Sequence, residues 1–392
     1  MIPLWIYMAF AFALGSCIGS FLNVVIYRLP RDKSLVYPPS ACPGCGKNIK
    51  FYDNIPILSW LILQGKCRNC KMSISPRYMI VEFITGCLFV AVFLLYFVYG
   101  SQRFEFGGLF GLDALHYGGW IFYFVHMALL CALLAASAID LELWVIPLSI
   151  CWFMTIVGLA GTAMGRYIVG IEDIGPSIIG YYRVLPNVDF QVITSLTIGA
   201  TIGLVIAIAL LATGIIKRSY PEQEDIAGKE PDEDNYNHRV EMLKEIVFLL
   251  PVIVGAFCGF WIFKSSPEIA ALIKKITLNP ITYGVIASLW GYFIGCAVVW
   301  ATRILGTMAF GKEAMGLGDV HLMGGVGAVI GPVFVVIAFF IAPFFGLAWA
   351  CYQMFFKKTR QIPYGPFLSL AVFAVMIFHD FFRQYIYNLY LY

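Results

Sequence analysis

Apolar runs of about 20 residues recur along the whole length of this chain, and each is long enough to cross a bilayer as a helix. Hydrophobic residues make up 60% of the 392 positions and charged residues only 12%. Soluble domains carry roughly a quarter charged residues, so this composition excludes a soluble globular protein. The sequence therefore predicts an all-α polytopic membrane protein, because a lipid interior leaves no other way to satisfy the backbone of isolated apolar segments.

The apolar runs divide into about ten candidate transmembrane helices. One of them, 313–331, is short and rich in glycine, and Gly331-Pro332 provides a turn into the next. No small-residue cleavage site follows the first run, so we expect it to be retained rather than removed as a signal peptide. The predicted spans are 2–26, 78–100, 118–139, 145–166, 191–215, 245–263, 282–303, 313–331, 333–356 and 365–388.

The loop between the first two spans predicts the orientation of the chain. Residues 28–77 carry nine basic side chains and two acidic ones. Loops rich in lysine and arginine stay in the cytoplasm, which places this loop inside and the N-terminus outside. Counting onward, basic clusters at 217–218, 303–312 and 357–360 also fall inside. The loop 264–280 disagrees, because it carries three lysines and is predicted to lie outside.

Four cysteines in the first loop form two CxxC pairs. Cys42-Pro-Gly-Cys45 and Cys67-Arg-Asn-Cys70 are separated by 21 residues. Two such pairs supply four thiolates for tetrahedral zinc, and a reducing cytoplasm disfavours disulfides. Two unrelated pairs or a redox switch are the alternatives. Because protein would fill all four zinc positions, we predict a structural metal in a small cytoplasmic zinc-ribbon-like domain between the first two helices.

Two aspartates lie at the edges of apolar runs. Asp140 follows Ser-Ala-Ile, and Asp319 closes Gly316-Leu-Gly318-Asp. A charged group at a transmembrane helix centre costs about 2.5–3.5 kcal/mol, so acids in such segments are candidates for function. The predicted topology places both near the cytoplasmic ends of their helices, although they are 179 positions apart. Two carboxyl groups brought together could share a proton and activate a water molecule.

Other residues near these acids leave alternatives open. Gly316 and Gly318 would let the backbone unwind so that an extended substrate reaches Asp319, although glycine pairs also serve close helix packing. Glu82, in the second span, is either a helix-end partner for Arg77 or a residue of the site. Acids in membrane spans also occur in proton-coupled transporters, which we keep as the alternative function. A protease acting on other membrane helices and a non-enzymatic scaffold are weaker interpretations.

These motifs together resemble those of the bacterial type IV prepilin peptidases, which are aspartic proteases of the GxGD type. The resemblance covers about 1–166 and 281–388, with the motifs in family order. The segments that carry it are Gly19-Ser-Phe-Leu-Asn-Val-Val-Ile-Tyr-Arg-Leu-Pro30, the CxxC pairs, Ser75-Pro-Arg-Tyr78 with Glu82, the Asp140 segment, Glu313-Ala-Met-Gly-Leu-Gly-Asp-Val320 and Pro363-Tyr-Gly-Pro-Phe367.

The resemblance implies a specific activity. Such an enzyme cleaves the leader of type IV prepilins and pseudopilins after a glycine, on the cytoplasmic side of the bacterial inner membrane. Asp140 and Asp319 match its two catalytic aspartates. Many members also methylate the new N-terminal residue with S-adenosylmethionine, and the zinc loop accompanies that second activity. We expect prepilins and the lipid bilayer as partners and no nucleic acid; the oligomeric state stays open.

The chain also departs from the family pattern between its two aspartate regions, where an extra segment lies. We therefore expect five parts. They are a first transmembrane helix (1–29), a cytoplasmic zinc-binding domain (30–77), helices carrying Asp140 (78–166), an insertion with two extra transmembrane helices and a polar loop at 217–245 (167–280), and helices carrying the GxGD motif (281–392).

Overall fold

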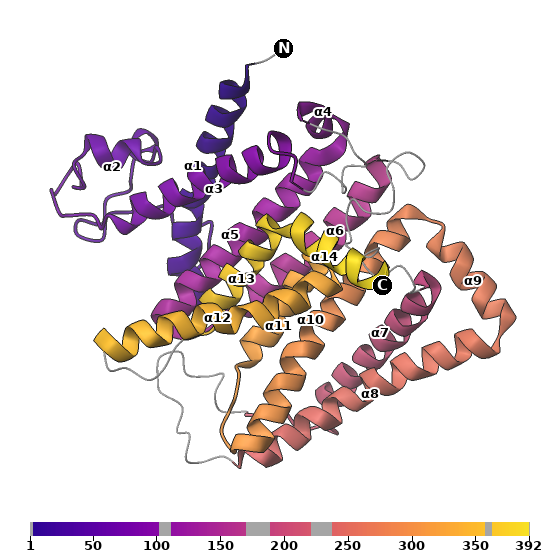
Figure 1. Ribbon diagram of the computed structural model, residues 1–392. Helices are drawn as coiled ribbons and strands as arrows, with labels where there is room; N and C mark the ends of the chain where they lie inside the picture. The colour runs from indigo at the N-terminus through magenta and orange to yellow at the C-terminus, as the bar shows by residue number, and fades with distance from the viewer. Residues whose placement is uncertain (1–2, 102–110, 170–188, 221–236, 357–362, 392) are drawn as a thin grey trace.

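The computed structural model describes residues 3–101, 111–169, 189–220, 237–356 and 363–391, and it confirms an all-α membrane protein. Regular structure in these ranges is helical apart from two isolated β-bridges. The α-helices (Figure 1) are α1 (Leu4–Arg28), α2 (Leu58–Ile62), α3 (Arg77–Phe97), α4 (Leu112–Ala114), α5 (Trp120–Leu143), α6 (Leu148–Val169), α7 (Phe190–Ala212), α8 (His238–Ser265), α9 (Pro267–Thr277), α10 (Pro280–Phe310), α11 (Leu317–Ile330), α12 (Pro332–Phe356), α13 (Gly365–Ile377) and α14 (His379–Leu391).

Eight helices in the described ranges are long and apolar enough to cross a membrane, namely α1, α3, α5, α6, α7, α8, α10 and α12. Two of the ten predicted spans differ from a simple crossing. α11 has only 14 residues. At the helical rise it is about 21 Å long, whereas the hydrocarbon core is roughly 30 Å thick. The last predicted span is broken, because α13 and α14 meet at a bend of 73°.

α5 and α11 lie inside the helix bundle. α5 packs against α1, α3, α6, α11 and α13, and 72% of its most apolar stretch is buried within the protein. α11 is enclosed by α5, α6, α10, α12 and α13, and every residue from Leu322 to Ile330 is buried. Polar groups on these two helices therefore meet protein atoms rather than lipid, which is where ionisable residues in membranes are tolerated.

Small residues hold α11 tightly against α10. A Cβ added at Gly291 or Gly295 of α10 would overlap backbone atoms of Gly327 or Met323 in α11. Such close backbone contact is the usual basis of helix association in lipid, where burial of apolar surface between helices gives no driving force. The packing fixes α11, and with it the position of Asp319 in the first turn of that helix.

α7 and α8 form a pair at the edge of the bundle, seen at the lower right of Figure 1. They pack mainly against each other, and none of the most apolar stretch of α8 is buried within the protein. α9 follows α8 and lies in the 264–280 segment whose lysines conflicted with the predicted topology. α9 is amphipathic, with Lys274 and Lys275 in its last turn, which suits a helix lying in the membrane interface.

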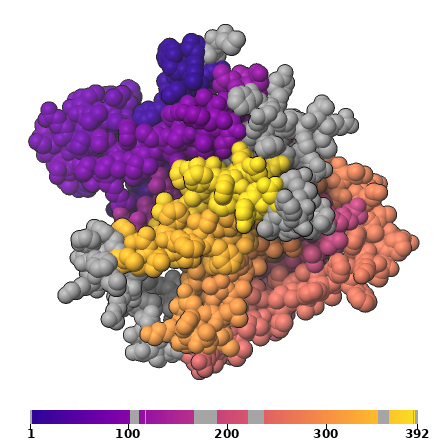
Figure 2. Space-filling view, viewed as in Figure 1, coloured from indigo at the N-terminus to yellow at the C-terminus, as the bar shows by residue number. Residues whose placement is uncertain are grey.

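The cysteine loop stands apart from the transmembrane helices. In Figure 2 it forms the lobe at the upper left, at the place where Figure 1 labels α2. Arg28 anchors the start of the loop by donating to the carbonyls of Ser34 (2.9 Å) and Pro38 (2.7 Å). The Trp60 indole N–H donates to Ile74 O at 3.2 Å and braces its far side. The four cysteines of this loop cluster together, as the predicted zinc-ribbon-like domain requires.

Candidate active site and candidate metal centre

The structure brings Asp140 and Asp319 together. Asp140 lies in the last turn of α5 and Asp319 in the first turn of α11. Both are nearly buried, with 7% and 8% of their surface exposed. The charge of Asp140 acts on the carboxyl of Asp319, so the two side chains lie within electrostatic reach despite a separation of 179 positions in sequence. Two acids at this proximity favour a single shared proton.

The turn that begins α13 approaches both acids. Gly365 donates its backbone N–H to Asp140 Oδ2 at 3.0 Å. Tyr364, one residue earlier, lies within electrostatic reach of Asp319. A Cβ added at Gly365 would come within 2.7 Å of Asp140 Oδ2, so any larger residue would push the carboxyl away. The Pro-Tyr-Gly-Pro turn is therefore the third element of the site, beside α5 and α11.

Ile146, in the segment between α5 and α6, lies against both the glycine before Asp319 and the glycine that binds Asp140. A Cβ added at Gly318 would lie 3.1 Å from Ile146 Cβ, and one at Gly365 would lie 3.3 Å from Ile146 Cδ1. One turn before Asp140, Ser137 donates to Ser369 Oγ at 2.8 Å and joins α5 to α13. Gly318 is thus used here for close packing, whereas unwinding of the backbone around Asp319 stays a prediction.

Gly316 caps the helix that carries Asp319. Its carbonyl accepts the N–H of Asp319 at 3.2 Å, and its extended ψ of 149° ends the preceding loop. A Cβ at Gly316 would lie 3.5 Å from Asp319 Oδ2, an ordinary contact. A carboxylate in the first turn of a helix is favoured by the helix dipole, which offsets part of the cost of burying Asp319 beside Asp140.

Glu82 has a role that neither of our interpretations contained. Its Oε2 accepts the N–H of Ile57 at 2.7 Å, and Ile57 has a φ of 63° in the cysteine loop. Arg77 instead forms an ion pair with Glu142, at the end of α5. Glu82 therefore fastens the cysteine loop to α3, and the Arg77 pair fastens α3 to α5.

The four cysteines gather in one cluster. The Sγ atoms of Cys42, Cys45, Cys67 and Cys70 all lie within 4.8 Å of one another, and those of Cys42 and Cys70 are 3.7 Å apart. All four are free thiols. Tetrahedral zinc with Zn–S bonds of about 2.3 Å places its sulfur ligands about 3.8 Å apart. These residues therefore fit a four-coordinate zinc ion with no position left for a substrate.

Both CxxC pairs lie on the same kind of backbone turn. In each, the first cysteine donates its N–H to the carbonyl five residues later, at 3.0 Å and 2.8 Å. The residue after the second cysteine has a positive φ in both, 66° at Gly46 and 59° at Lys71. Glycine adopts this conformation freely, whereas another residue is strained by roughly 1–2 kcal/mol. Backbone N–H groups of Cys70 and Asn69 lower the pKa of Cys67 to about 6, which favours the thiolate that binds a metal.

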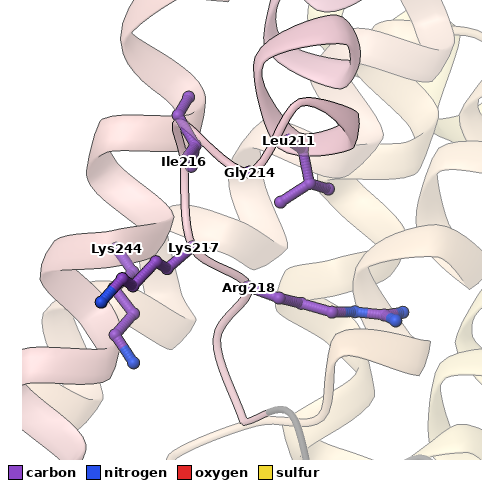
Figure 3. Close-up of a pocket in the computed structure, with 6 residues that line it drawn as sticks. All are labelled: Leu211, Gly214, Ile216, Lys217, Arg218 and Lys244. Atoms are coloured by element: carbon purple, nitrogen blue, oxygen red, sulfur yellow. The ribbon is translucent and has the colours of Figure 1, made fainter.

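A separate pocket lies on α7, the segment after it and α8. Its volume is about 470 Å³. Figure 3 shows the side chains of Lys217 and Lys244 extending side by side and that of Arg218 extending in another direction. Lys244 also pairs with Glu241 at 2.6 Å. The pocket shares no lining residue with the aspartate site, so we assign it no part in the chemistry there.

Two features of the site were not predicted from the sequence. Gly365 belonged to a recognised turn, but its hydrogen bond to Asp140 was not foreseen. Arg303 of α10 is 1% exposed and donates to Met315 O, directly before Gly316. A signal was present, because an arginine near the end of an apolar span needs a partner, whereas the basic cluster 303–312 by itself predicts only orientation.

Comparison with known proteins agrees with the motifs. Residues 13–96 match the family described as bacterial peptidase A24 N-terminal domain. A prepilin leader peptidase/N-methyltransferase of Myxococcus xanthus is 38% identical over 203 residues, which are 50% of this chain and 52% of the relative. One of Burkholderia pseudomallei is 32% identical over 190 residues, 41% of this chain and 55% of the relative.

A more distant relative aligns over nearly the whole chain. A type 4 prepilin-like proteins leader peptide-processing enzyme of Escherichia coli is 25% identical over 380 residues, 92% of this chain and 90% of the relative. The chain spans about half the length of the first curated relatives that it matches. No solved structure matches it.

Proposed function

We propose that this chain, a relative of the bacterial type IV prepilin peptidases, is an aspartic endopeptidase of the GxGD type. Its substrates are type IV prepilins or pseudopilins, and it removes their leader after a glycine. The observation that carries this proposal is the meeting of Asp140 and Asp319 at the ends of two buried helices. Nearly buried acids of like charge are hard to explain as structural elements, because they repel each other.

The chemistry follows from sharing one proton. The ionised aspartate accepts a proton from water as the water attacks the glycyl carbonyl. The protonated aspartate donates a hydrogen bond to that carbonyl and later gives its proton to the leaving amine. The Gly365 N–H supports this scheme because it holds one oxygen of Asp140 in place. Because the pair titrates as a unit, we do not assign the base to either residue.

The site would face the cytoplasm of a bacterial inner membrane. The end of the bundle that bears the acids also bears the basic cysteine loop, through Glu82 and the Arg77–Glu142 pair. Positive loops are retained in the cytoplasm. The five-part division of the chain, including 167–280 as an insertion, belongs to the same proposal. Zinc held by the four cysteines would maintain the fold of the loop and supply no reactive position.

A second activity, N-methylation of the new N-terminal residue with S-adenosylmethionine, is proposed from the names of the relatives. The glycines of Gly325-Val-Gly327 do not fit a cofactor. A Cβ at Gly325 would meet Cys151 O at 3.0 Å, and one at Gly327 would overlap Gly291 O, so neighbouring helices already fill this space. These glycines therefore form helix contacts and not a cofactor site. The proton-coupled transporter is not supported, since the relatives are named as leader-processing enzymes.

The test is direct cleavage of a candidate prepilin by the purified protein, read as intact mass. A loss equal to the leader identifies the peptidase, and the added mass of one methyl group identifies the methyltransferase. Asp140→Asn and Asp319→Asn should each lower cleavage by roughly 10⁴-fold or more, as loss of a residue that acts in a catalytic unit does. Membrane insertion and abundance should be unchanged. Near-normal processing by either variant would refute the aspartate pair.

A further inference from the structure

A second buried polar cluster lies beside the loop that leads into Asp319, and Arg303 is at its centre. The Arg303 guanidinium donates to Glu245 of α8, with Nε 3.1 Å from both carboxylate oxygens and Nη2 3.0 Å from Oε1. Its Nη1 donates to Glu313 Oε1 at 2.5 Å and to Met315 O. The planar fork is therefore held along two edges at once, which fixes its orientation.

Glu245 is itself held on its other sides. It is 4% exposed. Trp300 of α10 donates its indole N–H to Oε2 at 2.7 Å, and Ser219 donates to Oε1 at 3.2 Å. A buried carboxylate with four donors aimed at it has little freedom to move, and removing its charge leaves a buried arginine with weaker partners.

The cluster is connected to the proposed active site through the few backbone residues between Met315 and Asp319. Met315, whose carbonyl accepts from the guanidinium, precedes Gly316. The Gly316 carbonyl in turn accepts the N–H of Asp319 at 3.2 Å. The positive charge of Arg303 also reaches the Asp319 carboxyl. Glu245, from the segment expected to be an insertion, is thus linked to Asp319 through one side chain and a few backbone atoms.

We propose that Arg303 and Glu245 are positioning residues for the Asp319 side of the active site. The α7–α8 pair is then a working part of the enzyme rather than a passive addition. The proposal rests on the proposed function. Without the Glu245 charge, Arg303 loses its fixed orientation, and the 311–316 loop gains freedom. Because Asp319 must be aligned with water and the peptide bond, this freedom lowers turnover without altering the surface that binds the substrate.

The first experiment measures kcat and KM of Glu245→Gln with a prepilin substrate. We expect kcat to fall by about 10- to 100-fold and KM to stay within about twofold, as small misplacements of a reacting group do. Glu241→Gln is the matched control. Glu241 is also buried, at 6% exposed, and lies one turn earlier on α8. It binds the N–H of Tyr220 and the amine of Lys244 and forms no hydrogen bond with Arg303. Because the Tyr220 ring lies 5.6 Å from the Arg303 guanidinium, the loss of Glu241 should lower kcat, but far less than the loss of Glu245.

Further variants separate positioning from loss of fold. Glu245→Asp keeps the charge and should recover part of the lost kcat. In Glu245→Gln/Arg303→Gln, kcat should fall no further than in the worse single variant, because the two residues act through one linkage. Backbone hydrogen exchange of peptides covering 311–318 should accelerate in Glu245→Gln but not in Glu241→Gln, even where catalysis is too weak to measure.

Wild-type kcat in Glu245→Gln, an equal loss in Glu241→Gln, multiplicative losses in the double variant, or unchanged exchange at 311–318 would each overturn the proposal. Failure of the proposed function is a different result. In that case the wild type does not cleave prepilin, or Asp319→Asn still does. The exchange experiment still reports on the link between Glu245 and the 311–316 loop.

Discussion

The cysteine cluster and the aspartate pair are both gatherings of acidic groups, yet the chain builds them in opposite ways. The four thiols come from one loop, on two similar turns, and close completely around a metal-sized space. The two carboxyl groups come from helices 179 positions apart, and a single backbone N–H donates to Asp140 from a third element.

The difference concerns how each cluster is neutralised. Like charges held together need a positive partner, or they repel. Four thiolates around a tetrahedral zinc ion leave no free coordination position, so that cluster is inert. In the proposed mechanism the two carboxyl groups share a proton that stays transferable, so that the pair would act as acid and base. The same electrostatic problem thus has a structural solution in the loop and a chemical one in the bundle.

The largest effect expected from this comparison is loss of folding in the cysteine loop when a thiol ligand is removed. Cys67→Ser should lose the bound metal, and the loop 30–76 should become sensitive to protease, because structural zinc contributes about 10–16 kcal/mol to small metal domains. Asp319→Asn should unfold at the same or a higher temperature, since it removes a like-charge repulsion. Zinc content by atomic emission, limited proteolysis and thermal unfolding in detergent measure the three quantities. A metal-free Cys67→Ser loop that stays protected would break the comparison.

An intermediate effect is expected at the backbone donor of the aspartate pair. In Gly365→Ala the new Cβ would lie 2.7 Å from Asp140 Oδ2 and push the carboxyl aside. Cleavage should fall by about 10- to 100-fold through misplacement, with little change in unfolding temperature. Gly346→Ala is the control, because its Cβ would meet Phe367 Cδ2 at an ordinary 3.7 Å. Equal cleavage by the two variants would exclude Gly365 from the site.

The smallest effect is expected at the surface of the loop. Asp53 and Arg68 form an ion pair at 2.6 Å, and Arg68 lowers the pKa of the Asp53 carboxyl. Arg68 is exposed, and ion pairs of this kind contribute little in water. Asp53→Asn should therefore keep its zinc and show a much smaller gain in protease sensitivity than Cys67→Ser. Loss of zinc from Asp53→Asn would show that the pair, and not only the metal, holds the loop together.

Sequence patterns predicted what is local. The CxxC spacing identified the thiol cluster because all its ligands come from adjacent turns, and the length of apolar runs identified eight full spans because bilayer thickness sets that length. The final predicted span, 365–388, is present as two helices that meet at a bend of 73°. Its second half, α14, begins at His379, which is buried against Phe334 of α12, so this polar group meets protein rather than lipid.

Contacts between distant segments were predictable only in part. Equal depth in the membrane made the meeting of Asp140 and Asp319 an expectation, but nothing in the sequence pointed Gly365 at Asp140, 225 positions away. For Glu82, nearness to Arg77 in sequence predicts a helix-end ion pair, and its place at the level of the two aspartates predicts a role in the site. In the structure Arg77 forms an ion pair with Glu142, and Glu82 accepts a hydrogen bond from Ile57 in the cysteine loop. These partners are set by how the helices pack.

The brevity of α11 has a consequence for the backbone that leads into Asp319. α11 is long enough to cross only about two thirds of the hydrocarbon core. The rest of such a crossing would be non-helical backbone, which is stable in a membrane only where protein or water satisfies its amide groups. The non-helical stretch 311–316 precedes α11 and Asp319, and Arg303 holds it through the carbonyl of Met315. Under the proposed function, a scissile bond next to an apolar anchor would meet Asp319 beside this non-helical segment while the anchor stays among the acyl chains.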